Sequence, residues 1–330
     1  MTALLQVNDV KKHFRLRRGL SLRSGVVRAV DGVSFHIDKG ETLALVGESG
    51  SGKSTVGRAV LRLFGLTAGQ VILDGQRIDD LSAARLRPLR RRIQVVFQDP
   101  FSSLNPRLRV RDILAEPIRN FGLAKSTADV RSRIDVLMDK IGLPREAANR
   151  WPHEFSGGQR QRIGIALALA AEPDLIVCDE AVSALDVSVK AQIINLLQDL
   201  QRDLGLALLF ISHDLAVVEH ITHRVAVMYL GKIVETAPKR QIFSAPRHPY
   251  TKALLSAVPV PQPGAARSRI ILKGDMPSPL NPPRGCHFHT RCPFVFDRCR
   301  TTEPPLRLIE NNHFASCHLI DGPTAPSELN

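Results

Sequence analysis

An α/β fold with a mainly parallel sheet is the architecture that this sequence of 330 residues predicts. Short apolar segments with little alternation between polar and apolar positions recur along the chain, at residues 43–46, 93–97, 175–178, 206–211 and 224–229. Strands of this kind are typical of parallel sheets that helices cover on both faces. The first segment runs into a glycine-rich turn and then into residues 54–63, where apolar positions return at helical spacing. This order predicts a strand, a turn and a helix.

Two further regions depart from this pattern. Residues 105–150 carry a longer periodicity that is rich in Arg, Asp and Ala, so we expect a helical insertion there. Prolines cluster between residues 244 and 305. Because proline removes a helical hydrogen bond and clashes with the preceding turn, we expect the chain after about residue 241 to be a separate, loop-rich module. Near the front, the basic segment between Arg15 and Arg28 predicts a solvated hairpin or loop.

The composition limits the classes of protein that the chain can represent. Hydrophobic residues make up 44% and charged residues 23%, which excludes collagen-like, low-complexity and disordered chains. The formal net charge of +13 favours anionic partners, such as nucleic acid, nucleotide phosphates or an acidic membrane surface, but does not choose among them. No export signal is visible in residues 1–10. The longest apolar runs are roughly half the ~20 residues of a bilayer-crossing helix, so we expect a chain that does not span a membrane by itself.

The glycine-rich turn is the most specific motif in the sequence. It satisfies the pattern G-x-x-x-x-G-K-[ST] with the residues Gly47, Glu48, Ser49, Gly50, Ser51, Gly52, Lys53 and Ser54. Glycines allow the backbone to curl, so that successive N–H groups face a phosphate chain at the positive end of the following helix. We expect Lys53 to neutralise the β- and γ-phosphates and the Ser54 hydroxyl to ligate Mg²⁺.

Two carboxylates follow one of the predicted buried strands. Residues 175–178 are apolar, and Asp179 and Glu180 come directly after them. Asp179 can hold Mg²⁺ through water and Glu180 can polarise an attacking water molecule. An apolar run before Asp-Glu is weak evidence by itself, but together with the phosphate-binding turn it predicts a nucleotide-hydrolysing site.

A second glycine-containing turn precedes a helical segment. Ser156, Gly157, Gly158 and Gln159 stand before residues 160–170, and a helix N-terminus of this kind can bind an anion. In isolation such a turn is more often merely flexible. The chain has one lysine-bearing nucleotide site and two phosphate-facing turns, which makes mechanical sense if the second turn covers a nucleotide held by another subunit.

Together these residues resemble the ATP-binding subunits of ABC transporters over about residues 4–240. Six motifs occur in the family's order, namely the Walker A loop at 47–54, Gln98, the signature turn at 156–159, the Walker B strand at 175–179, the D-loop at 183–186 and His213. The resemblance implies a P-loop NTPase (RecA-like) core with a mainly parallel sheet and an antiparallel β N-terminal subdomain. It also implies an ATPase domain at residues 1–240 with an α-helical subdomain at about 99–160, and a small C-terminal extension at 241–330.

The resemblance also assigns a role to each motif. It implies that Glu180 is the general base, that His213 bonds the γ-phosphate, and that Gln98 ligates Mg²⁺ with Ser54 and Asp179, so that Glu180, His213, Gln98 and Lys53 form the catalytic set. The implied cofactors are ATP and Mg²⁺. The implied nucleotide-binding set is Phe14, Gly47, Glu48, Ser49, Gly50, Ser51, Gly52, Lys53, Ser54, Thr55, Gln98, Ser156, Gly157, Gly158, Gln159, Asp179 and Asp186. Phe14 matches the aromatic that stacks on adenine, although a core phenylalanine is the alternative. Ala181 stands where this family often has proline, which removes no functional group.

The tail resembles the C-terminal extension of dipeptide and oligopeptide transporter ATPases. The resemblance rests on His248-Pro249-Tyr250-Thr251-Lys252, Gly285-Cys286 and Arg291-Cys292-Pro293. It implies an importer of peptides, or of another solute of the group such as nickel or glutathione. The implied partners are a second ATPase subunit, favoured to be a paralogue, two membrane permease subunits and an external peptide-binding protein. The implied location is the cytoplasmic face of the bacterial inner membrane, as a peripheral subunit.

Four cysteines lie in the proline-rich tail, at Cys286, Cys292, Cys299 and Cys317. Four thiolates in a stretch without its own core suggest a metal that supplies cohesion. The spacing fits zinc knuckles poorly and is not that of a ferredoxin, although some relatives in the family that the chain resembles carry a [4Fe–4S] cluster here. Zinc and metal-free thiols remain alternatives, whereas a reducing compartment disfavours disulfides. Cys178 is expected to be a small buried hydrophobe.

Two competing functions deserve comparison with the transport ATPase. A nucleic-acid-associated ABC ATPase would suit the net charge, but such proteins usually join two cassettes or carry long insertions, and this chain has neither, so no nucleic-acid partner is expected. A degenerate, structural partner subunit is disfavoured because Lys53, Glu180 and His213 are all present.

Overall fold

The computed structural model describes residues 3–16, 25–99, 103–258 and 269–321. Most of the basic segment predicted between Arg15 and Arg28 lies outside these residues, including Arg17, Arg18 and Arg23.

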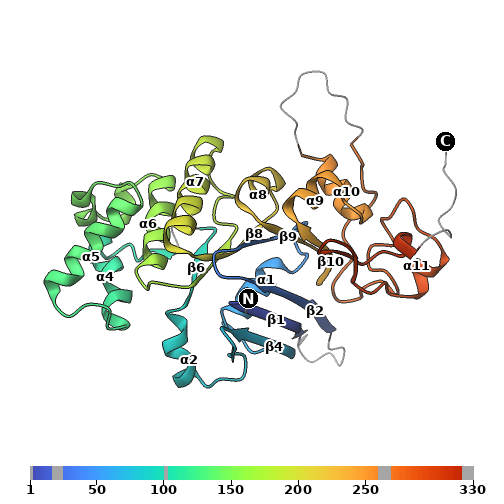
Figure 1. Cartoon of the computed structure of the whole chain (residues 1–330), viewed down its shortest axis with the longest axis horizontal. Coiled ribbons are helices and arrows are strands. Elements are labelled where there is room, and N and C mark those ends of the chain that lie inside the picture. Colours follow the sequence, from blue (N-terminus) through green and yellow to red (C-terminus); the bar gives the residue numbers. More distant parts are fainter. Residues whose placement is uncertain (1–2, 17–24, 100–102, 259–268, 322–330) are drawn as a thin grey trace.

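A large mixed sheet runs through the centre of the molecule (Figure 1). Among the described residues it has eight strands, in the order β11-β12-β10-β9-β3-β8-β7-β6. The five that pair in parallel are β9 (Arg224–Tyr229), β3 (Thr42–Val46), β8 (Ala207–Ser212), β7 (Leu175–Asp179) and β6 (Ile93–Phe97). The sheet continues in antiparallel pairing through β10 (Lys232–Pro238), β12 (His313–Ala315) and β11 (Arg307–Glu310). The predicted buried parallel strands are confirmed.

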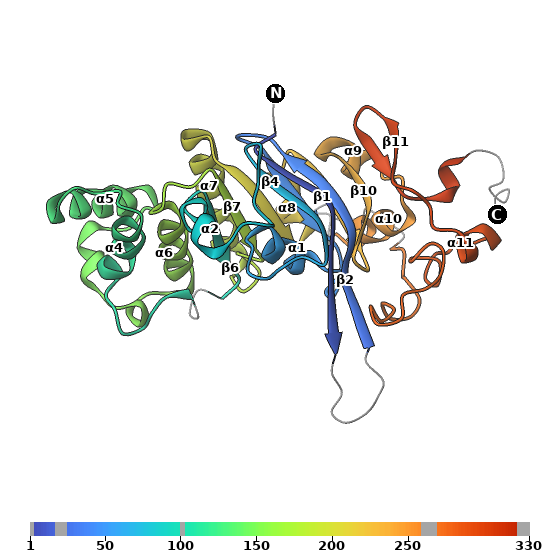
Figure 2. The same cartoon turned by 90° about the horizontal axis from the view of Figure 1, so that it is seen from below.

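A second, antiparallel sheet packs against one face of the first, below it in Figure 1 and in front of it in Figure 2. Its order is β2-β1-β4-β5, formed by β2 (Gly25–Ile37), β1 (Leu5–Leu16), β4 (Ala68–Leu73) and β5 (Gln76–Arg77). Helix α1 (Lys53–Val60) lies between the two sheets, and its buried Val56 and Val60 join both of them in one hydrophobic core. The antiparallel N-terminal subdomain expected from the resemblance is therefore present.

Helices cover the opposite face of the central sheet. The helical insertion contains α4 (Val110–Asn120), α5 (Thr127–Lys140) and the short η1 (Arg145–Asn149) and η2 (Pro152–Glu154), and it leads into α6 (Gly157–Leu169). Close to the sheet lie α7 (Val187–Leu204) and α8 (Leu215–Ile221), while α2 (Ala83–Arg90) precedes β6. Ser126 caps α5 by accepting a hydrogen bond from the Asp129 N–H, which fixes the start of that helix.

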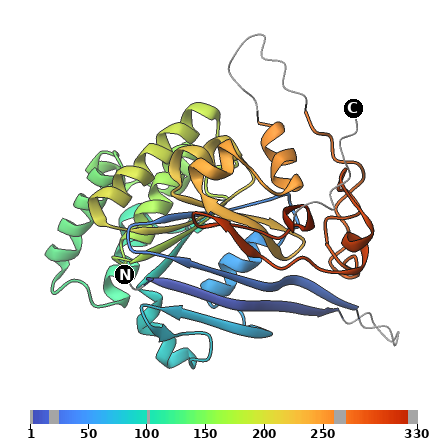
Figure 3. The ribbon, with the colours of Figure 1, turned by 45° about the vertical axis from the view of Figure 1, so that its right-hand side comes forward.

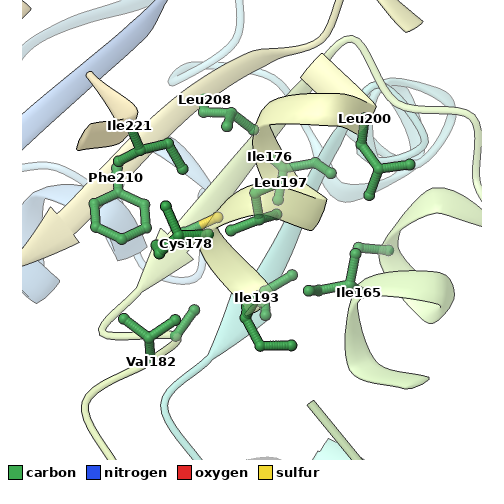
Figure 4. Close-up of a cluster of buried hydrophobic side chains, with 14 of the residues drawn as sticks. Ile165, Ile176, Cys178, Val182, Ile193, Leu197, Leu200, Leu208, Phe210 and Ile221 are labelled. Atoms are coloured by element: carbon green, nitrogen blue, oxygen red, sulfur yellow. The ribbon is translucent and has the colours of Figure 1, made fainter. Parts of the chain in front are cut away.

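The central strands are apolar throughout because both of their faces are covered. Successive side chains of a strand point to opposite faces, so Ile176 and Cys178 of β7 face the helices, whereas Leu175 and Val177 face the core around α1. Figure 4 shows Cys178 among Ile176, Phe210 and other apolar side chains of the helical side. Burial raises the pKa of the Cys178 thiol to about 12, as expected for a buried hydrophobe.

The C-terminal segment packs against the core instead of standing apart from it (Figure 3). It contains α9 (Lys239–Ser244), α10 (Pro249–Ser256), α11 (Asp297–Thr301) and η3 (His318–Asp321) besides β11 and β12. Strand β12 pairs with β10, so this segment adds two strands to the sheet of the ATPase core. The division of the chain into two domains near residue 240 stays a prediction.

A buried polar cluster fastens β12 to β10. The Glu235 carboxylate is fully buried and accepts hydrogen bonds from the backbone N–H groups of Arg247 and His248, at 2.7 and 3.0 Å. Its Oε1 also lies 2.6 Å from Nε2 of His313, which is itself fully buried. These bonds keep the pKa of Glu235 below its ordinary value although burial acts in the opposite direction.

Candidate nucleotide-binding site

The phosphate-binding loop joins β3 to α1 as the sequence predicts. Close packing explains two of its glycines: Gly47 and Gly52 have φ values of +149° and +105°, and a Cβ atom on either would lie 2.2–2.3 Å from a backbone oxygen. The Lys53 side chain is buried, and its Nζ donates hydrogen bonds to the carbonyl oxygens of Gly47 and Glu48, at 2.8 and 2.9 Å. The loop therefore surrounds its own lysine.

The structure brings together two residues that were predicted to share a metal ion. The Ser54 hydroxyl donates a hydrogen bond to Oδ1 of Asp179 at 2.7 Å, across 125 residues of sequence. Burial raises the pKa of Asp179, and the bond from Ser54 opposes that shift. Burial also lowers the pKa of Lys53, whereas the charges of Glu180, Asp179 and Glu48 act to raise it. A hydroxyl and a carboxylate are ligands that Mg²⁺ accepts beside phosphate oxygens.

Glu180 and His213 lie at the carboxyl edge of the same sheet. Glu180 follows β7 with φ at +52°, a conformation that costs a residue with a side chain about 1–3 kcal/mol and is typical of functional sites. Its backbone N–H donates to the carbonyl of Ile211, which ties it to β8. Nδ1 of His213 lies 3.4 Å from Oε1 of Glu180. The two side chains expected to act together are therefore adjacent.

Gln98 reaches this edge from the neighbouring strand. It follows β6 directly, and Phe97 of β6 is paired with Asp179 of β7, so Gln98 comes next to the two carboxylates along the edge. Its side chain is exposed. The carbonyl of Phe97 accepts a hydrogen bond from the side chain of Gln161 in α6, which links this strand end to the helical part.

Phe14 is 37% exposed on β1 and is not a core side chain. Its ring meets that of Phe64 edge to face, with 5.8 Å between centroids, and Nζ of Lys12 lies 4.9 Å from its centroid. The core alternative for Phe14 is wrong, and its role in binding adenine stays a prediction.

The signature turn lies on a different element from the phosphate-binding loop. Ser156 caps α6, and the side chain of Gln159 accepts a hydrogen bond from the Ser156 N–H, which gives a reciprocal capping box. A Cβ atom on Gly158 would lie 2.4 Å from Val189 of α7, so this glycine is required for close helix packing. Asp186 begins α7 and is exposed, and the Val187 side chain beside it is 83% exposed.

Two residues that the sequence analysis did not assign to the site contact its loop. The Tyr250 hydroxyl accepts a hydrogen bond from the Glu48 N–H at 2.8 Å, and the Arg291 guanidinium donates to the Glu48 carboxylate at 2.6 and 3.2 Å. Both belong to motifs that had been used only to recognise the C-terminal extension. Their contact partner could not be read from spacing, because Arg291 is 243 residues from Glu48.

The four cysteines of the C-terminal segment gather in one region. Each pair of these thiols is close enough for electrostatic interaction, and in three of the four the backbone N–H two residues further along bonds to the sulfur. Burial raises the pKa of Cys286 to about 11 and that of Cys292 to about 12. Within the part of the chain that the structure describes, however, no group of three or more His, Cys, Asp or Glu side chains is arranged to hold a metal ion. A preformed metal site at these thiols is therefore not found.

Comparison with known proteins settles the family. The chain is 53% identical over 328 residues to the probable peptide ABC transporter ATP-binding protein y4tS of Sinorhizobium fredii, covering 99% of this chain and 92% of the relative. It belongs to the ABC transporter family. The ABC transporter family model matches residues 30–183, and the model of the oligopeptide/dipeptide transporter C-terminal region matches residues 234–299.

Further relatives and solved structures agree with this assignment. The oligopeptide transport ATP-binding proteins AppF of Bacillus subtilis and OppF of Salmonella typhimurium are 52% and 50% identical, with 96% of this chain and 96–97% of each relative covered. The dimeric post-hydrolysis structure of the ATP-binding cassette MJ0796 with ADP and Pi superposes with a TM-score of 0.63 at 29% identity, covering 72% of this chain and 99% of that one. The structure of cbiO1 from Clostridium perfringens gives a TM-score of 0.64 at 26% identity, with coverage of 74% and 91%.

The ABC family assignment fixes the activity class. The chain is a transport-coupled ATPase that binds ATP, and the predicted α/β cassette is confirmed. Among the described residues, no helix is both long and apolar enough to cross a bilayer.

Proposed function

We propose that this ATPase energises the import of dipeptides or oligopeptides through a membrane permease. The substrate class is supported by relatives named as peptide or oligopeptide import proteins, and by the matching C-terminal region. The contact between Ser54 and Asp179 is the observation that carries the chemistry, because it joins the loop that holds phosphate to the end of the strand that directly precedes the proposed base, Glu180.

Each group of residues in the site has a separate role in ATP hydrolysis. The N–H groups of residues 47–55 and the Lys53 ammonium bind the phosphate chain, and Phe14 stacks on adenine. Ser54, Asp179 and Gln98 would hold Mg²⁺, and the ion would supply positive charge beside the phosphate oxygens. Glu180 accepts a proton from the attacking water, and His213, 3.4 Å from it, keeps that carboxylate in place and bonds the γ-phosphate.

We infer that the site is completed by a second cassette. The capping box at the N-terminus of α6 uses the N–H groups of Ser156 and Gln159, and the N–H groups of Gly157 and Gly158 between them lie at the positive end of the helix, where an anion from outside the chain can bind. The exposed Asp186 and Val187 beside them provide further surface for that partner. The dimeric cassette structure bound to ADP and Pi supports this arrangement. The expected partner is a paralogous ATPase.

The remaining partners are two permease subunits and an external peptide-binding protein that acts through them. A groove of about 380 Å³ between the core and the helical insertion suits the permease contact, since it runs from Gln94 of β6 to Glu116 and Phe121 at the end of α4. Because β6 leads directly to Gln98, a permease segment in this groove would sense the state of the nucleotide. We therefore propose the cytoplasmic face of the bacterial inner membrane as the location of the chain, as a peripheral subunit.

The replacement Glu180→Gln tests this function. It keeps the side chain's shape but removes the base, so ATP turnover should fall by about 10²-fold or more while ATP binding persists. The purified complex should then accumulate an ATP-bound cassette dimer, measured by nucleotide content and by size-exclusion chromatography. Unchanged hydrolysis in this variant would remove Glu180 from its role, and peptide uptake that does not depend on the chain would refute the transport function.

For the four cysteines, we propose a [4Fe–4S] cluster whose assembly draws the thiols to ligand distance. The donor set fits in chemistry, since four thiols converge and backbone N–H groups already bond to three of the sulfurs. Anaerobic purification followed by iron analysis and a visible spectrum tests this. About four irons per chain with a broad charge-transfer band would support the cluster, while zinc or metal-free thiols in a folded chain would refute it.

A further inference from the structure

The C-terminal segment holds the phosphate-binding loop by the side chain of Glu48. Arg291 follows the turn after Cys286, and its side chain is only 8% exposed. Nη1 and Nη2 of its guanidinium donate to the two carboxylate oxygens of Glu48, at 2.6 and 3.2 Å. A bidentate contact of this kind fixes the orientation of the carboxylate as well as its distance from the guanidinium, and it is among the stronger polar interactions in proteins.

The same segment also holds Glu48 by its backbone. The Tyr250 hydroxyl accepts the hydrogen bond of the Glu48 N–H. Its ring is buried against Tyr229 and Phe288, with centroids 4.8 and 5.4 Å away, so the hydroxyl cannot move freely. The N–H and the carboxylate of this one loop residue are therefore both fixed from outside the ATPase core.

The carbonyl oxygen of Glu48 completes a connection to the catalytic lysine. It accepts a hydrogen bond from Nζ of Lys53 at 2.9 Å. The position of the Glu48 carbonyl therefore determines where the Lys53 ammonium lies before ATP binds. When ATP binds, the phosphate oxygens replace the carbonyl as the hydrogen-bond acceptors of this ammonium. A side chain that fixes Glu48 thus acts on the residue that neutralises the phosphates.

We propose that Arg291 is a positioning residue for ATP hydrolysis, which orders the phosphate-binding loop through its paired contact with Glu48. The inference rests on the proposed function only in that ATP binds this loop. It gives the C-terminal extension a part in the nucleotide site, in addition to its packing on the sheet. Arg291 directly precedes Cys292, so the contact with the loop lies one residue away from one of the four cysteines.

The replacement Arg291→Met tests the proposal, with Arg284→Met as its matched control. Arg284 is an exposed arginine of the same segment and lies outside the Glu48 contact. The reconstituted transporter supplies KM and kcat for ATP, and the full chain supplies the dissociation constant for Mg²⁺-ATP by calorimetry. A loop that is ordered in both the ground state and the transition state contributes uniform binding, so its loss raises KM more than it lowers kcat.

For Arg291→Met we expect KM and the dissociation constant to rise about tenfold, with kcat changed less than threefold. Arg291→Lys keeps the positive charge but cannot form the bidentate contact. Its KM and dissociation constant should therefore lie between those of Arg291→Met and the wild type. Arg284→Met should match the wild type. An unchanged KM for Arg291→Met would overturn the proposal, whereas failure of the wild-type chain to bind ATP would instead refute the proposed function.

Glu48→Gln removes the same ion pair from the loop side and leaves the C-terminal segment intact, so it keeps the test valid if Arg291→Met folds poorly. It should weaken ATP binding to a similar degree. The double variant should be no worse than either single variant, because both remove one shared contact. Additive losses would show that Arg291 acts only on the stability of its own segment, and they would overturn the proposal.

Discussion

Replacing Glu235 with Gln is expected to destabilise the chain strongly, although the two side chains have nearly the same shape. The carboxylate is fully buried and accepts hydrogen bonds from the N–H groups of Arg247 and His248 and from the ring of His313. A Gln side chain has one acceptor oxygen instead of two, so its NH₂ group would face a donor. Stability is lost both through the missing charge-assisted bonds and through a buried N–H group left without an acceptor.

The size of the effect follows from this inventory. Breaking a buried pair by removing one charge costs about 3–5 kcal/mol, and keeping one neutral acceptor recovers part of it, so we expect a loss of ~2–4 kcal/mol. With an unfolding entropy of about 2.1 cal/mol/K per residue, this loss corresponds for 330 residues to a fall of roughly 3–6 °C in the midpoint of thermal unfolding. Since Glu235 and His313 join β10 to β12, the C-terminal segment should unfold first.

Thermal unfolding followed by circular dichroism measures the loss, and Glu310→Gln is the matched control. Glu310 pairs with Arg247 on the surface, with half of its side chain exposed, so its replacement should change stability by less than ~1 kcal/mol. The folded pKa of Glu235 lies below its ordinary value, so its contribution is complete above about pH 4.5 and disappears as the pH falls through the folded pKa. Equal stability of the two Glu→Gln variants at pH 7 would refute this reasoning.

Three further changes test other parts of the structure. Gly158→Ala places a methyl group 2.4 Å from Val189, so it should lower stability by ~1–3 kcal/mol in denaturant unfolding and abolish most ATP turnover; wild-type turnover would contradict the packing argument. Ser54→Ala removes the hydroxyl that meets Asp179, and should weaken ATP binding about tenfold or more in the presence of Mg²⁺ but little in EDTA, as calorimetry can measure. Cys178, with a thiol pKa of about 12, should resist alkylation at pH 8 in the native chain and react once the chain is unfolded, and rapid native labelling detected by mass spectrometry would disprove its burial.

Much of the core could be predicted because its cause is local. Residues 93–97 and 224–229 are mainly apolar, with a single polar residue each, and the structure has strands at those residues, β6 and β9. The phosphate-binding loop is equally local, since its glycines and its lysine lie within eight residues. A strand that is buried on both faces is recognised by a short, mainly apolar segment, and a phosphate-binding loop is recognised by closely spaced glycines. Both patterns lie within a short stretch of sequence.

The contacts of the C-terminal segment could not be predicted in the same way. The spacing of Arg291 and Tyr250 does not identify Glu48 as their partner, because they are 243 and 202 residues away from it and meet it only in the folded chain. Glu235 is a fully buried carboxylate in β10, and its burial is explained only by partners such as His313, which lies 78 residues away in the sequence. Proline content indicated loops correctly, but packing of those loops depends on tertiary partners.

The C-terminal segment covers the outer edge of β10, because β12 pairs with this strand. A protein shortened after this strand would present unpaired peptide groups along that edge, the kind of surface on which chains associate with one another. It would also leave the carboxylate of Glu235 buried without its imidazole partner. Excised cassettes of this kind are therefore expected to aggregate, and nucleotide assays on them would describe a damaged loop instead of the working one.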